Sequence, residues 1–197
     1  MKKVIGFFGV ARSGKSTAAH YAAEWFRKRD YTAQVRSFAG PLKEGLAEMG
    51  IEKDTHPELY RHAAQYMGTE ICRDYDPDWW VKQMDRCINN LPEDGVVLID
   101  DCRFQNEFEY LQSIDATLVF MRGGSRIDLR SPIYDHSSET IAVGYEQFFN
   151  SRDLGCNAWR DLLSDEARPD HIILNHVEMP VMFQHLEEVL QKIEVSI

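Results

Sequence analysis

The segment that most constrains this chain is a loop near its start, which reads Gly9-Val-Ala-Arg-Ser-Gly14-Lys15-Ser16. The pattern Gly-x-x-x-x-Gly-Lys-Ser is typical of a loop that wraps around phosphate groups. Glycine at two positions lets the backbone approach an anion closely, and the N–H groups of the loop then hold its oxygens. The motif therefore predicts a nucleoside triphosphate site, with Lys15 on the β- and γ-phosphates and Ser16 on Mg²⁺.

The flanking sequence fits this interpretation. The apolar run Val4-Ile-Gly-Phe-Phe8 precedes the loop and is typical of a buried strand. Residues 17–29 follow it, are rich in alanine and end in basic residues, as the C-terminus of a helix favours. A positive helix N-terminus would then face the phosphates. We expect the triphosphate to contact most of the loop: Gly9, Ala11, Arg12, Ser13, Gly14, Lys15, Ser16 and Thr17.

Composition sets limits on the class of protein. The chain has 197 residues, a formal net charge of −10 and a pI of about 5.1. An acidic chain of this length predicts a single domain over residues 1–197 without stable nucleic-acid binding, since such binding needs a basic surface. The four cysteines form no Cys-x-x-Cys pair, and no apolar run is long enough for a membrane span. We expect a cytoplasmic protein without a signal peptide or membrane contact.

Strand and helix patterns alternate along the chain. Apolar runs predict five strands, at 4–8, 33–39, 96–101, 117–121 and 171–175. Helical patterns fall between them, at 17–29, 41–49, 57–72, 78–90, 104–113 and 180–193. This alternation predicts a three-layer α/β fold of the P-loop kind, with a parallel sheet between two helical layers. The helical residues 41–90 are expected to bind the molecule that accepts a phosphoryl group from the triphosphate. The irregular stretch 122–170 is expected to form a lid and an insertion.

The ends of the third and fourth strands carry charged residues. Asp100 and Asp101 close an apolar run, so one of them is expected to hold Mg²⁺. Because neighbouring strand residues face opposite sides, only one would point into the site; Asp101 is the preferred one. The alternative is a pair of acids that simply cap a strand. After the fourth strand, Arg122, Arg126 and Arg130 are spaced four apart, so on a helix they would form either a phosphate-binding face or a solvated one.

Several side chains could face the phosphate loop from the acceptor side. Arg103 follows the aspartates, and Lys43 follows the second strand; either one contacts phosphate or is exposed. Arg61 and Gln65 lie one helical turn apart, as a phosphate contact and a base-edge contact would require. Tyr66, Trp79 and Trp80 are candidates for stacking on a base, although an aromatic side chain is more often part of a core.

Taken together, these segments resemble the deoxynucleoside monophosphate kinases of tailed phages. The matching stretches are Gly9 to Ser16, Ala39-Gly-Pro-Leu-Lys43, Arg61 to Glu70, Trp80-Val-Lys82, Asp101-Cys-Arg103, Asn106-Glu107 and His136-Ser-Ser-Glu139. The combination is more specific than the phosphate loop alone. The stretch from about 141 to 170 departs from the family by its length.

The resemblance implies transfer of the ATP γ-phosphate to the 5′-phosphate of a deoxynucleoside monophosphate, with Mg²⁺ as cofactor. It also implies a host-cell cytoplasmic location for a phage-encoded chain, and a possible homodimer. By the same resemblance, Lys15, Ser16 and Arg12 belong to the ATP site. The catalytic candidates are Lys15, Arg103 and Asp101, and the spacing of the arginines adds Arg122 and Arg126 to the ATP-site candidates. The acceptor candidates are Lys43, Arg61, Gln65, Tyr66, Trp80 and Arg103. His136 and Glu139 match a family motif without an evident physical role.

Two other functions are compatible with the same motifs. Kinases of other phosphorylated metabolites, of the phosphomevalonate or dephospho-coenzyme A type, share the phosphate loop and Asp-x-Arg-like features. A non-catalytic nucleotide-binding module would bind ATP without acceptor-stimulated turnover. A panel of acceptors in a coupled ATP assay separates these alternatives.

Overall fold

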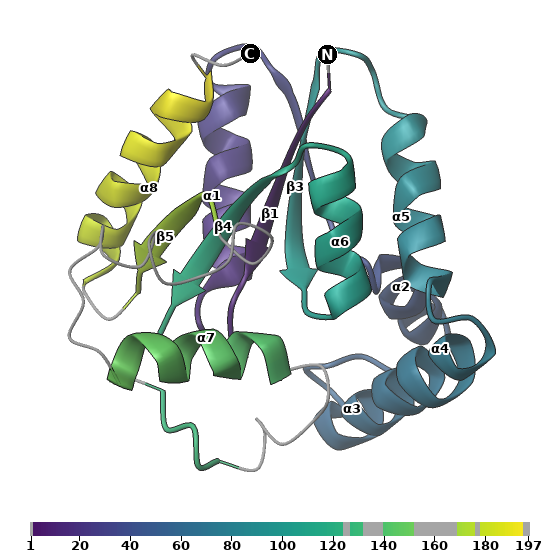
Figure 1. Cartoon of the computed structure of the whole chain (residues 1–197). Coiled ribbons are helices and arrows are strands. Elements are labelled where there is room, and N and C mark those ends of the chain that lie inside the picture. The colour runs from purple at the N-terminus through teal and green to yellow at the C-terminus, as the bar shows by residue number, and fades with distance from the viewer. Residues whose placement is uncertain (1, 124–126, 132–139, 152–168, 176–177, 195–197) are drawn as a thin grey trace. The chain divides into compact units, whose positions relative to one another are not determined.

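The computed structural model describes residues 2–123, 127–131, 140–151, 169–175 and 178–194 (Figure 1). The chain divides into two compact units. One unit comprises Met1–Val35 and Pro92–Ile197, and contains nearly all of the sheet. The other unit, Arg36–Leu91, begins with the last residue of a strand and otherwise consists of helices joined by loops.

A five-stranded sheet forms the centre of the first unit. Its strands are β1 (Lys3–Phe8), β2 (Thr32–Arg36), β3 (Gly95–Cys102), β4 (Thr117–Arg122) and β5 (His171–Leu174). They lie in the order β2-β3-β1-β4-β5. Strand β1 pairs in parallel with β3 and β4, and β4 pairs in parallel with β5. All five strands were predicted from the sequence, and the expected α/β fold with a parallel sheet is confirmed.

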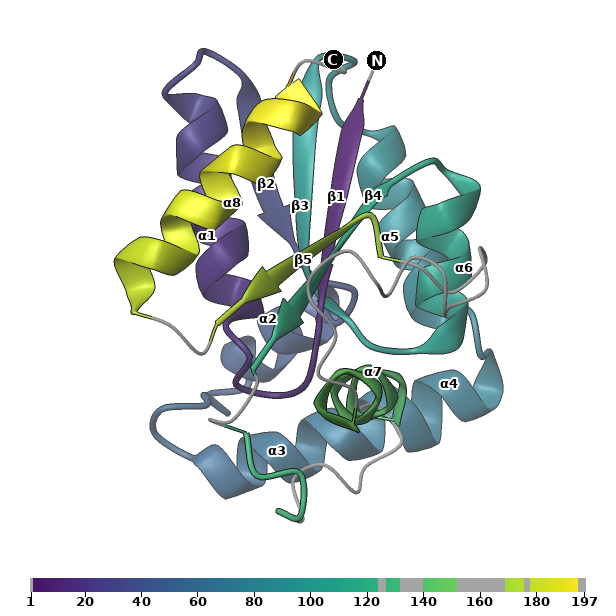
Figure 2. The same cartoon turned by 60° about the vertical axis from the view of Figure 1, so that its left-hand side comes forward.

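Four helices of this unit surround the sheet: α1 (Lys15–Arg27), α6 (Gln105–Ser113), α7 (Thr140–Ser151) and α8 (Met179–Glu194). Helices α1 and α8 cover one face and α6 covers the other, as Figures 1 and 2 show. Helix α7 crosses the edge where the strands end. Because the sheet is parallel, the loops after β1, β3 and β4 leave it at that same edge, where ligands of such sheets bind.

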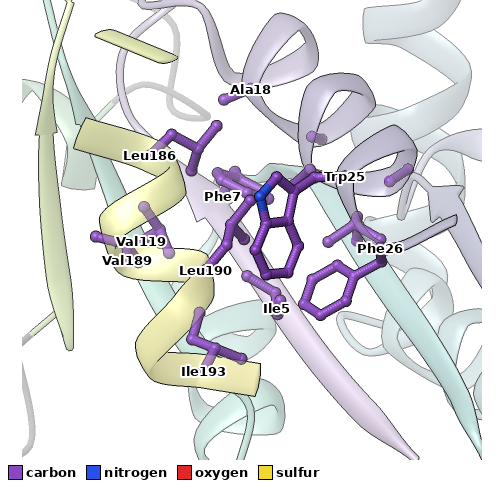
Figure 3. Close-up of a cluster of buried hydrophobic side chains, with 14 of the residues drawn as sticks. Ile5, Phe7, Ala18, Trp25, Phe26, Val119, Leu186, Val189, Leu190 and Ile193 are labelled. Atoms are coloured by element: carbon purple, nitrogen blue, oxygen red, sulfur yellow. The ribbon is translucent and has the colours of Figure 1, made fainter. Parts of the chain in front are cut away.

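The core between the sheet and the helices α1 and α8 explains why the first strand is so apolar. Ile5 and Phe7 point from β1 toward this face and are fully buried with Phe26 of α1 and Leu190 of α8 (Figure 3). On the opposite face, a Cβ atom at Gly6 would lie 2.7 Å from the side chain of Leu111 on α6. Both faces of β1 are therefore packed, and the loop after it begins from a rigid strand.

The helical unit contains α2 (Gly40–Glu48), α3 (Pro57–Gln65), η1 (Tyr66–Ile71), α4 (Cys72–Tyr75) and α5 (Trp79–Asn89). The sequence predicted one helix over 57–72, but the structure interrupts it with the π-helix η1. Gly68, at the centre of η1, is buried, and a Cβ atom there would lie 3.1 Å from Leu42 of α2. Its carbonyl oxygen accepts a hydrogen bond from the indole Nε1 of Trp80 at 2.9 Å. These contacts hold the wider turn at Gly68, which periodicity alone does not reveal.

The interpretation of 122–170 as wholly irregular is wrong. Helix α7 lies within this stretch and buries Ala142, Glu146 and Phe149. Among the residues that the structure describes, no helix is long and apolar enough to cross a membrane.

Candidate phosphate-binding site

The loop between β1 and α1 has a backbone that requires glycine at two positions. Gly9 has a φ of 146°, and a Cβ atom there would lie 2.4 Å from the carbonyl oxygen of Met121. Gly14 has a φ of 92°, and a Cβ atom there would lie 2.4 Å from Nδ2 of Asn175. Arg12 also has a positive φ, of 67°. The positive φ angles and the close packing therefore both require glycine at positions 9 and 14.

Lys15 is buried, and its ammonium group lies within the loop. Its Nζ donates hydrogen bonds to the carbonyl oxygens of Gly9 and Val10, each at 2.8 Å. These two bonds hold the amino group close to the loop backbone. Lys15 thus stabilises the loop internally. A bound phosphate would compete with the two carbonyl oxygens for the Nζ donor.

Ser13 is the most enclosed residue of the loop. Its side chain is fully buried, and among the described residues its Oγ has no hydrogen-bond partner. Its N–H donates to the carbonyl oxygen of Val10 at 3.1 Å, and its own carbonyl accepts from Nδ2 of Asn175 at 2.7 Å. Because a buried hydroxyl without a partner is costly, its place in this loop fits a site that gains a polar ligand.

The other predicted loop contacts lie nearer the surface. Ser16 and Thr17, in the first turn of α1, are exposed, as is Arg12. Ala11 is half-buried and, with Val10, packs against apolar side chains of the loop after β4 and of α7, namely Ile127, Leu129, Ala142 and Val143. The exposed hydroxyl of Ser16 is thus accessible at the N-terminus of α1, as a metal ligand would have to be.

The end of β3 contains a feature that strand alternation does not predict. Gly6 of β1 pairs with Ile99, but Phe8 pairs with Cys102, so Asp100 and Asp101 together oppose one residue of β1. This is a β-bulge, which redirects side chains and often occurs beside active sites. Both aspartates are 9% exposed. The alternation argument, which allowed only one of them into the site, therefore does not hold across this pair.

The segment after the aspartates is anchored by a buried carboxylate. Oε2 of Glu107, on α6, accepts hydrogen bonds from the backbone N–H of Arg103 at 2.7 Å and of Phe104 at 3.0 Å. Glu107 is 1% exposed, so these charge-assisted bonds lie out of water and hold the Arg103 backbone firmly. The half-buried side chain of Arg103 thus extends from a backbone that is held in place at the edge of the sheet.

Cys102 lies between these charged groups and is fully buried. Burial raises the pKa of its thiol well above the usual range, and the charges of Glu107 and Asp101 raise it further. The charge of Lys15 acts in the opposite direction. Cys102 is therefore a neutral thiol within electrostatic reach of both the phosphate loop and the bulge of β3.

Arg122 and Arg130 do not lie on a helix, so the helix face considered from the sequence does not form between these two residues. Arg122 is the last residue of β4, and its Nε lies 3.9 Å from Oε2 of the fully buried Glu146 on α7. Its guanidinium also lies over the ring of Phe149, at 5.5 Å from the centroid. Arg130 is in a turn and pairs with Asp128 at 2.8 Å. Arg126 lies outside the described residues.

Helix α7 is fastened to this edge of the sheet through more than one contact. Glu146 accepts a hydrogen bond from the N–H of Gly123, directly after β4. The ring of Tyr145 packs against Phe8 and Phe120, with centroids 5.2 and 5.3 Å apart. Burial raises the pKa of Tyr145 to about 12. The ion pair between Glu146 and Arg122 is a further contact that holds α7 to β4.

The predicted acceptor residues lie in the helical unit, and their environments differ. Arg61 and Tyr66 are exposed, Gln65 and Lys43 are half-buried, and no residue of α3 is buried. Trp80 is only 5% exposed and donates its indole N–H to Gly68. The stacking role expected of Trp80 is therefore replaced by a structural one. His136 and Glu139 lie outside the described residues.

Three residues of the site were not found by sequence reasoning. Asn175 contacts the loop from beyond β5, and Glu146 reaches Arg122 from α7. Neither has a local signal, since each partner lies far away in the sequence. Glu107 did have a signal: an acidic residue in the first turn of a helix commonly accepts from the preceding backbone N–H groups.

Comparison with known proteins shows similarity to a curated protein and to a solved structure. No family model matches the chain. A curated protein of Acanthamoeba polyphaga mimivirus, named "Putative deoxynucleotide monophosphate kinase", is 27% identical over 194 residues. The match covers 76% of this chain and 96% of that protein.

A solved structure of APS kinase CysC from Mycobacterium tuberculosis, in complex with AMPPNP and APS, has a TM-score of 0.47 and 15% identity. It covers 98% of each chain. The fold assignment above rests on the strand order and pairing of this chain, independently of that likeness.

Proposed function

We propose that this protein is a kinase that transfers the γ-phosphoryl group of ATP to a deoxynucleoside 5′-monophosphate. The observation that carries the proposal is the buried ammonium group of Lys15 inside a loop whose two glycines leave no room for side chains. The name of the mimivirus relative supports the acceptor class. The resemblance to the tailed-phage kinases supports the same acceptor and a role in phage DNA synthesis.

The phosphate loop would bind the triphosphate through its backbone N–H groups and Lys15. In the proposed state, the Nζ of Lys15 exchanges its bonds to Gly9 and Val10 for phosphate oxygens. The side chain needs only to change acceptors, because it already points into the loop. Arg12 and Thr17, both exposed beside the loop, are further proposed contacts.

The residues present also fit a magnesium ion. Mg²⁺ commonly uses one or two protein oxygens together with substrate phosphates. The exposed Oγ of Ser16 and a carboxylate from the bulge at Asp100 and Asp101 are the proposed donors, with Asp101 preferred. When bound, the ion would offset the charge of the β- and γ-phosphate oxygens.

The proposed reaction requires positioning more than proton transfer. An oxygen of the acceptor phosphate forms a bond to the γ-phosphorus, the bond from that phosphorus to the β–γ bridging oxygen breaks, and ADP leaves. The acceptor oxygen is already ionised near neutral pH, so no strong general base is needed. Lys15 and Arg103 would offset charge on the transferring group.

The acceptor is proposed to bind to the helical unit. Arg61 is exposed and would pair with the acceptor phosphate, while Gln65, one turn along α3, would contact the base. Lys43 and the exposed Tyr66 are further proposed contacts. A cytoplasmic location and a homodimer remain parts of the proposal that rest on the resemblance.

A panel of acceptors tests this function. ATP consumption is measured with each common and modified deoxynucleoside monophosphate, and with phosphomevalonate and dephospho-coenzyme A. We expect turnover with at least one deoxynucleoside monophosphate and formation of its diphosphate. Turnover with only a non-nucleotide acceptor would reject the proposed substrate, and ATP binding without turnover on any acceptor would indicate a non-catalytic module.

A further inference from the structure

Two polar side chains hold the two halves of the phosphate loop. Lys15 holds its first half, through the carbonyl oxygens of Gly9 and Val10. Asn175, which directly follows β5, holds its second half through the carbonyl oxygen of Ser13 at 2.7 Å. Both residues donate to the loop backbone, but Lys15 is also a proposed phosphate ligand, whereas no phosphate contact is proposed for Asn175.

Asn175 is itself fixed by the sheet. Its backbone N–H donates to the carbonyl oxygen of Arg122 at 2.8 Å, which extends the β4–β5 pairing one residue beyond the pair of Arg122 and Leu174. Its side-chain amide lies so close to Gly14 that a Cβ atom there would be 2.4 Å from Nδ2. The position of the side-chain amide of Asn175 is therefore set by the backbone hydrogen bond to β4 and by the packing against the loop at Gly14.

The geometry of the peptide bond gives this contact a direction. In a trans peptide, the carbonyl of Ser13 and the N–H of Gly14 point to opposite sides. When Asn175 holds that carbonyl, the N–H of Gly14 must point away from β5. This N–H precedes the first turn of α1, and so belongs to the donors that have no partner within a helix.

We infer that Asn175 is a positioning residue that keeps the second half of the phosphate loop in its binding conformation. The inference rests on the proposed use of the loop for a triphosphate. Once Lys15 turns to a phosphate, its bonds to Gly9 and Val10 weaken, and the bond from Asn175 to Ser13 remains. Asn175 then preserves the loop geometry through both states without touching the phosphates.

Two substitutions and one control test this inference. Asn175→Ala removes the side-chain amide, and Asn175→Leu keeps a similar volume without a donor. Asp170→Ala is the control, because Asp170 accepts from the N–H of Leu118 at 2.7 Å and so supports the start of β5 without contacting the loop. Thermal unfolding of all three variants identifies any that fail to fold.

The measurements are the affinities for ATP and for tripolyphosphate, which lacks base and sugar, by displacement of a fluorescent ATP analogue. For both Asn175 variants we expect the affinity for each ligand to fall about tenfold, as the loss of a partly buried hydrogen bond would give. The Michaelis constant for the acceptor should stay unchanged. Asp170→Ala should lower the melting temperature without changing either affinity.

Three results would overturn the inference. Affinities of the Asn175 variants equal to those of the wild type would show that the contact is dispensable. Weaker ATP binding with unchanged tripolyphosphate binding would show that Asn175 contacts the base instead. Failure of the wild type to bind either ligand would remove the triphosphate site altogether. Failure of the proposed acceptor would appear separately, as ATP binding without turnover on any deoxynucleoside monophosphate.

Discussion

The phosphate loop and the helical unit Arg36–Leu91 differ in where their chemical groups point. In the loop, two polar side chains face inward: Lys15 is buried against backbone carbonyls, and Ser13 is fully buried. On α3 of the helical unit, no residue is buried, and Arg61 is exposed. Tyr66, which begins η1, is 56% exposed.

This difference indicates how each region would recognise its ligand. A loop that uses its backbone N–H groups needs a fixed shape, and this shape depends on contacts with β5 and on the glycines. A set of exposed side chains gains its order only from the ligand, so single substitutions should weaken binding without disturbing the fold. The two regions should therefore respond to mutation in different ways.

The largest expected effect is on the loop side. Lys15→Ala removes the buried ammonium group, and we expect kcat to fall about 10³-fold because charge on the transferring group is no longer offset. The coupled ATP assay measures the rate, and circular dichroism checks that the fold is intact. Full activity in a folded Lys15→Ala variant would remove the loop from the mechanism.

The bulge of β3 provides the next effect. Asp101→Asn should lower kcat about 10²-fold, on the scale of losing one preorganised electrostatic group, and should raise the Mg²⁺ concentration needed for half-maximal rate. Asp100→Asn is the matched comparison, since both side chains are equally buried. A larger loss in Asp100→Asn would transfer the metal role to that residue.

On the helical unit, Arg61→Ala should raise the Michaelis constant for the acceptor by about 10- to 100-fold, as the loss of a charge-assisted hydrogen bond to phosphate implies. The constant for ATP should stay the same. The control is Arg86→Ala, an exposed arginine on α5 without a proposed role. Equal effects of the two substitutions would mean that Arg61 has no specific contact.

The smallest expected effect is on the free energy of unfolding of a Trp80 variant, and it tests whether Trp80 is structural or binds a ligand. Trp80→Phe keeps the buried ring but removes the donor to Gly68, so we expect unfolding to become easier by about 1–3 kcal/mol. Chemical denaturation measures this change, with Trp79→Phe, at a half-buried position of the same helix, as control. An unchanged stability together with a weaker acceptor affinity would return Trp80 to the binding site.

Much of the fold was predictable because its signals are local. Four of the five strands contain a short apolar run, and the loop motif fixes where β1 ends and α1 begins. The loop glycines were also predictable, since their conformations follow from the motif. The sequence predicted that the sheet is parallel. It did not predict the order of the strands, because no local signal indicates which strands are neighbours.

The parts that escaped prediction depend on distant partners or on register. The bulge at Asp100 and Asp101 arises from pairing with β1, and strict alternation gave the wrong rule for that pair. The π-helix depends on Trp80 and Leu42, which come from other helices. Glu146 pairs with Arg122 from α7, a helix that the sequence analysis missed; the expected contact of Arg122 with ATP stays a prediction.

The most direct test of the central claim follows the transferred phosphoryl group itself. The protein is incubated with ATP labelled at the γ-phosphate and with a deoxynucleoside monophosphate, and the labelled products are separated. The account predicts that the label appears in the deoxynucleoside diphosphate, and that Lys15→Ala abolishes this transfer. Label found only in inorganic phosphate, or remaining in ATP with every deoxynucleoside monophosphate, would contradict the account.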